Sequence, residues 1–134
     1  MPVLPLTDRP AAVALPHVAP EAAPPHGPLA LELSAGSDPA ALAGLLERTV
    51  AIRILFAGFA DGRGFSLARR LRDLGFAGRL RAVGALIPDQ RGALRACGFD
   101  EIELTAERLA RQGPDAWSAE AAAPPFRHRT RRIA

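Results

Sequence analysis

The strongest constraint on the fold is an apolar run followed by a glycine-rich polar loop and an amphipathic helix. Residues 50–57 are apolar apart from Arg53, as expected of a central strand in a parallel sheet that is covered on both faces. The loop contains Asp61-Gly62-Arg63-Gly64, leucines then recur at helical spacing between residues 67 and 74, and Gly75 is placed to end the helix. This pattern predicts one β-α unit.

Three further units of the same kind are predicted around the first. Together they indicate an α/β fold of four successive β-α units with a small parallel sheet, either open and flavodoxin-like or curved like a half-barrel. The alternating acids of residues 101–104 predict a strand at an exposed edge of that sheet. The other predicted strands are residues 29–34 and 80–87, and the remaining helices begin at Asp38, Pro88 and Thr105.

Composition divides the chain into a folded domain and two tails. Residues 1–28 hold eight of the 13 prolines and are expected to be an extended or disordered tail. Residues 29–117 form the expected α/β domain, and residues 118–134 a basic, flexible tail. Because no aromatic residues are interleaved with its arginines, we expect no binding of nucleic acid.

The scarcity of cysteine and histidine limits the chemistry of the chain. Cys97 is the one cysteine, which excludes an intrachain disulfide and a cysteine-based metal centre. The three histidines lie in the predicted tails, so no metal and no cofactor is expected in the domain. Prolines interrupt the N-terminus where a secretory signal would be apolar, and no run is long enough to span a membrane. We therefore expect a cytoplasmic protein without a membrane partner.

The candidate site follows from the predicted topology, because ligands of parallel α/β sheets bind beyond the carboxyl ends of the strands. After the central strand, Arg63 stands between Gly62 and Gly64, next to a helix start whose free N–H groups favour an anion. A small oxyanion such as sulfite, or a phosphate, is expected to bind Arg63 and Ser66 there. The loop is neither a P-loop nor a dinucleotide motif, since the lysine and the third glycine are missing.

Three more polar residues are candidates for the same site, namely Asp61, Asp89 and Gln90. Asp89 and Gln90 open a helix, where an acid is favourable, and a role as general acid or base stays open beside that structural role. No catalytic residue is assigned. A structural alternative stays open: the Asp61 loop is only a turn, Ser66 caps the helix, and Arg63 pairs with Asp61 or Asp89.

Several of these motifs together resemble an uncharacterised bacterial family, a domain-of-unknown-function group numbered 934. The resemblance covers residues 29 to 117 and is strongest between residues 59 and 104. Phe65 stands where many members have tyrosine, and the segment after Trp117 departs from the family. The matching segments are Asp61-Gly62-Arg63-Gly64-Phe65-Ser66, Ala68-Arg69, Leu71-Arg72, Arg81-Ala82, Asp89-Gln90 and Cys97-Gly98-Phe99-Asp100.

Members of that family are described as accessory proteins, or probable oxidoreductases, of sulfite reduction. The resemblance implies an accessory protein of assimilatory sulfite reduction, non-catalytic and acting with sulfite reductase. The alternative is a small oxidoreductase or oxyanion-binding enzyme of the same pathway, with its site at the carboxyl ends of the strands, so whether the chain is an enzyme stays open. The predicted edge strand and the small core also suggest a homo-oligomer, in which two half-barrels complete one barrel.

Overall fold

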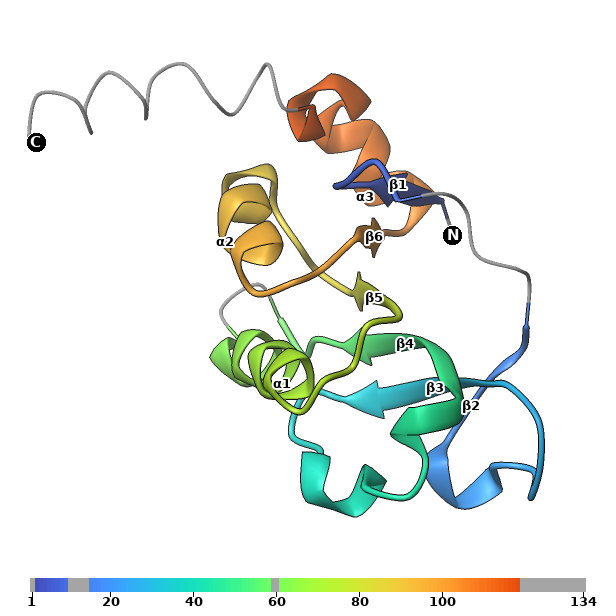
Figure 1. Ribbon diagram of the computed structural model, residues 1–134. Coiled ribbons are helices and arrows are strands. Elements are labelled where there is room, and N and C mark those ends of the chain that lie inside the picture. The colour runs from blue at the N-terminus through green and yellow to red at the C-terminus, as the bar shows by residue number, and fades with distance from the viewer. Residues whose placement is uncertain (1, 10–14, 59–60, 119–134) are drawn as a thin grey trace, which may run out of the picture.

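The computed structural model describes residues 2–9, 15–58 and 61–118, which form one six-stranded sheet with helices (Figure 1). The strands follow the order β1-β6-β5-β4-β3-β2. The α-helices in these ranges are α1 (Gly62–Asp73), α2 (Arg91–Ala96) and α3 (Ala106–Gln112). The strands are β1 (Val3–Pro5), β2 (His17–Val18), β3 (Leu29–Ser34), β4 (Thr49–Leu55), β5 (Arg79–Val83) and β6 (Glu101–Glu103).

The topology confirms the predicted α/β class. The four strands from β3 to β6 are mutually parallel and adjacent in chain order. A flavodoxin-type order reverses direction within the sheet, whereas this order steps in one direction, as in a segment of a (βα)-barrel. In Figure 1, α1 and α2 lie on the same side of the strands.

The first crossover differs from the predicted helix that begins at Asp38. Two short 3₁₀ turns, η2 (Pro39–Leu42) and η3 (Leu46–Arg48), connect β3 to β4. Asp38 does cap the first turn, because its Oδ1 accepts a hydrogen bond of 2.9 Å from the Ala40 N–H. Gly44 lies between the two turns, and a glycine disfavours the interior of a continuous α-helix.

The apolar core lies between the sheet and the helices. Leu67 and Leu71 of α1 and Leu94 of α2 are almost completely buried. Leu74, the last leucine of the predicted stripe, follows the end of α1 and is exposed, so the stripe is confirmed only for its first two leucines. The buried strand residues of this core form two rows that run across neighbouring strands. These buried residues are Leu31, Ile52 and Leu80 in one row, and Leu33, Ile54, Ala82 and Ile102 in the next.

The N-terminal segment packs against both edges of the sheet, although its prolines had suggested a free tail. β1 pairs antiparallel with β6, and β2 pairs parallel with β3. Leu6 is buried, and its N–H donates to the Asp100 carbonyl at 2.8 Å. The segment is extended, as expected, and its prolines are compatible with strands at a sheet edge. Apart from Ser118, the predicted basic tail lies outside the described residues.

The prediction that residues 101–104 form an exposed edge strand is wrong, because β6 lies between β1 and β5. Its alternating acids have a different cause: they belong to a chain of ion pairs, the charge ladder, on the sheet face that α1 and α2 do not cover. Glu103 accepts from Arg53 at 3.1 Å and from Arg81 at 2.8 Å. In order, the charge ladder consists of Glu32, Arg53, Glu103, Arg81, Glu101 and Arg79.

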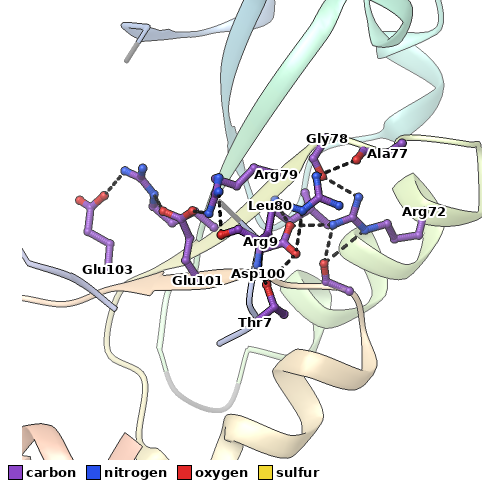
Figure 2. A network of polar contacts seen from close by, with 12 residues as sticks. Thr7, Arg9, Arg72, Ala77, Gly78, Arg79, Leu80, Asp100, Glu101 and Glu103 are labelled. Carbon is purple, nitrogen blue, oxygen red and sulfur yellow. Dashed lines mark hydrogen bonds and ion pairs between the residues drawn. The ribbon is translucent and has the colours of Figure 1, made fainter. Parts of the chain in front are cut away.

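A second polar network joins the C-terminal ends of α1 and α2 to the start of β6 (Figure 2). Arg72 donates to the carbonyls of Phe76, Gly78 and Gly98 at distances of 2.7 to 3.2 Å. Asp100 accepts from Arg72, from the Leu80 N–H and from Thr7, and it forms an ion pair with Arg9. The network lies at the amino ends of the strands, away from the predicted site, and has a structural role. In the described ranges no helix has the length and apolar character needed to cross a membrane.

Candidate functional site

An open pocket lies at the carboxyl ends of β3 and β4, where the topology predicted a site. Its volume is about 550 Å³. One wall is the loop after β3, with Ala35, Gly36, Ser37 and Pro39. The other wall is the first half of α1, with Gly62, Arg63, Ser66, Leu67 and Arg70.

The N-terminus of α1 is capped by Asp61. The Asp61 Oδ1 accepts from the Arg63 N–H at 3.2 Å, and its Oδ2 accepts from the Ala57 N–H at 3.1 Å. Ser66 lies one turn further along the helix, so the alternative in which Ser66 caps it is wrong. Because the protein's own carboxylate occupies the helix terminus, attraction of a ligand anion must come from the arginines of the pocket.

Arg63 is held at one edge of its guanidinium. Its Nε lies 3.1 Å from Asp61 Oδ1, which is the Asp61 pairing of the structural alternative. Its Nη1 lies 3.1 Å from the position that a Cβ would take on Gly36, so the group reaches across to the opposite wall. Hydrogen bonds from Arg63 and from the Ala57 N–H lower the pKa of Asp61, which therefore remains a carboxylate.

Arg63, Ser66 and Arg70 lie on one stripe of α1, because residues three and seven positions apart share a face of a helix. Arg70 was not among the predicted site residues. The structure places it in the pocket wall, where its side chain is exposed. Its spacing from Arg63 and Ser66 was the sequence signal that could have identified it.

The two glycines around Arg63 have different surroundings. Gly62 lines the pocket, and a Cβ added to it would meet no atom within 4 Å. Gly64 is buried, and a Cβ there would lie 2.4 Å from two carbons of the Phe56 ring. Gly64 is therefore explained by close packing of α1 on Phe56 and does not line the pocket.

Asp89 and Gln90 do not line the pocket either. Both belong to the 3₁₀ turn η4 (Pro88–Gln90), which precedes α2. The Gln90 Oε1 accepts from the Ile87 N–H at 3.0 Å, which stabilises the turn. Asp89 is exposed at the start of that turn, where an acid is favourable.

The position of His17 contradicts the expectation that every histidine lies in a tail without packed structure. It belongs to β2, on the row that contains Ala30 of β3. Burial lowers its pKa from the ordinary value of 6.5, and the charges of Arg81 and Arg53 lower it further. His17 therefore lies near the charge ladder and is not part of the pocket wall.

The pocket carries groups that bind anions. Arginine and serine side chains donate hydrogen bonds to oxyanions, and a serine without an adjacent base is not an activated nucleophile. Cys97 is buried elsewhere, which raises the pKa of its thiol. Across the part of the chain that the structure describes, no three His, Cys, Asp or Glu side chains are grouped to hold a metal ion.

Comparison with known proteins gives one family and no named relative. Residues 30–123 match the model of a family described as "Bacterial protein of unknown function (DUF934)". No curated protein and no solved structure matches the chain.

Proposed function

Because the chain belongs to this DUF934 family of bacterial proteins, we propose that it is a non-catalytic accessory protein of assimilatory sulfite reduction. In this proposal it acts beside sulfite reductase in the cytoplasm and binds an oxyanion, free or carried on a larger molecule. The family resemblance supports the pathway. The pocket between the β3 loop and α1 supports the binding of an oxyanion.

The observation that carries the proposal is the pair of arginines in the pocket wall. Arg63 is bound through Nε, and the described residues offer no partner to its Nη1 and Nη2. Arg70 has no carboxylate partner in the same ranges. Guanidinium groups bind oxyanions through two parallel N–H donors, and Ser66 adds a hydroxyl between the two arginines.

A binding role fits the pocket better than catalysis. General acid-base catalysis requires a group that gains and loses a proton near the working pH. The ionisable side chains of the pocket wall are two arginines, which stay charged. Hydrogen bonds from Arg63 and from the Ala57 N–H lower the pKa of Asp61, so it is poorly suited to proton transfer.

A growth experiment tests whether the protein acts in sulfite reduction. A strain that lacks the gene is grown on sulfate, sulfite or sulfide as sole sulfur source, with and without the full chain. Growth only on sulfide, restored on the other two by the chain, supports a role in sulfite reduction. Equal growth of the deletion strain on all three sources overturns the proposed pathway.

A binding experiment tests the pocket. Sodium sulfite is titrated calorimetrically into the full chain and into the variants Arg63→Gln and Arg70→Gln. Each variant should bind about tenfold more weakly, since a hydrogen bond to a charged group contributes about 1.5 kcal/mol. Arg69→Gln is the matched control, because Arg69 lies on α1 outside the pocket wall. Equal binding by all four proteins overturns the oxyanion site.

A further inference from the structure

The arginines on the two sides of the sheet differ in how their charge is balanced. On the side of the charge ladder, Arg53, Arg79 and Arg81 each form an ion pair with a carboxylate. On the other side, α1 contains four arginines and α2 contains two, whereas Asp73 is the one acid of these two helices. The helix layer therefore carries an excess of positive charge.

Three exposed arginines of the helix layer have no acidic partner. Arg69, Arg70 and Arg95 are exposed, and none of them forms an ion pair with a carboxylate of the described residues. The ion pairs that these helices do make are those of Arg63 and Arg72. An arginine without a local carboxylate keeps its charge available for a molecule that docks on the surface.

The ends of α1 and α2 bring these arginines onto one surface. Both helices lie on the same side of the strands (Figure 1). Arg72, in the last turn of α1, donates to the carbonyl of Gly98 just after α2 at 3.2 Å. Arg69, earlier on α1, donates a hydrogen bond to the thiol of Cys97, and Arg95 lies two residues before that cysteine. Arg69 and Arg95 therefore flank the same contact between the helices.

An exposed apolar side chain follows the arginines of α1. Leu74 is 58% exposed, more than any other large apolar side chain of the described residues. It lies one helical turn after Arg70, whose carbonyl accepts from the Leu74 N–H at 2.9 Å. A single exposed leucine is ordinary on a protein surface. Beside unpaired arginines it supplies the apolar contact that protein interfaces combine with a charged rim.

The chemistry of this surface favours an acidic protein over a nucleic acid. Proteins that bind single-stranded nucleic acids combine a basic groove with aromatic side chains on which the bases stack. The Phe and Trp side chains of the described residues are buried or half-buried. Arginine is instead enriched at protein interfaces, and opposite charges on two protein surfaces steer their encounter.

We propose that the helix layer is a docking surface for a partner protein whose contact segment carries carboxylates next to an apolar side chain. The carboxylates lie against Arg69, Arg70 and Arg95, and the apolar side chain lies against Leu74. Arg70 also belongs to the pocket wall, whereas the other three residues lie outside it. The docking surface therefore goes beyond the proposed oxyanion site and does not depend on it.

The test measures binding of a labelled synthetic peptide, in which glutamates flank a leucine, to the full chain by fluorescence anisotropy. The double variant Arg69→Gln/Arg95→Gln should weaken binding about tenfold, or about threefold for each exposed ion pair. Arg108→Gln/Arg111→Gln is the matched control, because it removes the same charge from α3. Its binding should change by less than about twofold, since distant charges are screened. Equal losses in the two double variants, or no binding of the peptide, overturn the docking surface.

Leu74→Ser tests the apolar contact. It should weaken binding of the leucine peptide about threefold and leave unchanged the binding of a peptide with glycine in place of that leucine. An equal effect on both peptides overturns the apolar contact.

Two further measurements separate the alternatives. Tighter binding of an oligothymidine than of the acidic peptide, lost in Arg69→Gln/Arg95→Gln, would make the surface a nucleic-acid site and overturn the acidic partner. Sulfite binding by the same variant should equal that of the unchanged chain, because neither arginine lines the pocket. Loss of peptide binding with sulfite binding retained supports the docking surface, and failure of the oxyanion site alone leaves peptide binding intact.

Discussion

Arg72 and Asp100 form an ion pair, with 3.0 Å between Nη2 and Oδ2, that joins the last turn of α1 to the residue before β6. Asp100 is buried, and its other oxygen lies 3.3 Å from Arg9 Nε in the N-terminal segment. The same carboxylate accepts from the Leu80 N–H in β5. One pair of side chains thus connects the helix layer, two strands and a segment remote in sequence.

Arg72→Ala should destabilise the fold by about 3 kcal/mol, because it leaves Asp100 with less compensating charge and three backbone carbonyls without their donor. Urea unfolding measures the change. Arg70→Ala on the same helix is the control, because its side chain is exposed, and it should change the free energy of unfolding by less than about 0.5 kcal/mol. A similar loss in both variants would contradict a specific role for Arg72.

Gly64→Ala should destabilise the protein, because its Cβ would lie 2.4 Å from the Phe56 ring. A loss of about 1–3 kcal/mol is expected from overpacking of this kind. Gly62→Ala is the matched control, since it lies on the same turn of α1 with open space around it. Thermal unfolding of both variants checks the difference. Equal stability of the two would show that Phe56 moves aside without cost.

The sequence predicted best those features that depend on neighbouring residues. The apolar run of β4, the buried Leu67 and Leu71 of α1 and the cap that Thr105 provides for α3 follow from local signals, and the structure confirms them. These signals work because periodicity and capping act within one or two turns. The parallel order of the central strands followed from the alternation of predicted strands and helices.

Features that depend on distant residues could not be predicted in the same way. β1 pairs with β6 although Val3 and its partner Glu103 are far apart in the sequence. No local pattern in residues 3–5 indicates that pairing. The acids of β6 therefore suggested a strand exposed to solvent. In the structure they pair with arginines of β5 and of β4. Arg70 was not predicted as a site residue, because its position in the pocket depends on the β3 loop on the opposite side.

His17 should make stability depend on pH in a defined window. In the folded protein burial lowers its pKa below 6.5, and Arg81 and Arg53 lower it further, while Glu103 and Glu32 oppose the shift. The unfolded chain therefore takes up the proton first, so the free energy of unfolding falls as the pH drops from 6.5 toward the lowered pKa. Above 6.5 the contribution is fully present.

Urea unfolding between pH 7.5 and 5 tests this expectation. His17→Gln should lose the part of the pH dependence that histidine supplies, while the carboxylates act equally in both proteins. His26→Gln is the control, because His26 is exposed in the segment between β2 and β3. Identical pH profiles for His17→Gln and the unchanged chain would contradict the inferred environment of His17.

Glu103 should contribute more to the free energy of unfolding than the end of the charge ladder does. Its side chain is only 8% exposed, and it accepts from Arg53 and Arg81. Glu103→Gln removes one of the two carboxylate partners of Arg53 and one of the two of Arg81, which keep Glu32 and Glu101. Because two charge-assisted hydrogen bonds are weakened at a poorly solvated place, a loss of about 1.5–3 kcal/mol is expected. Glu32→Gln, at the other end of the ladder, removes a carboxylate that is 40% exposed and that, among the described residues, pairs with Arg53 alone. Water screens that pair, and the loss should stay below about 1 kcal/mol. Urea unfolding at low and high salt compares the two, and equal losses would mean that the ladder is solvated along its whole length.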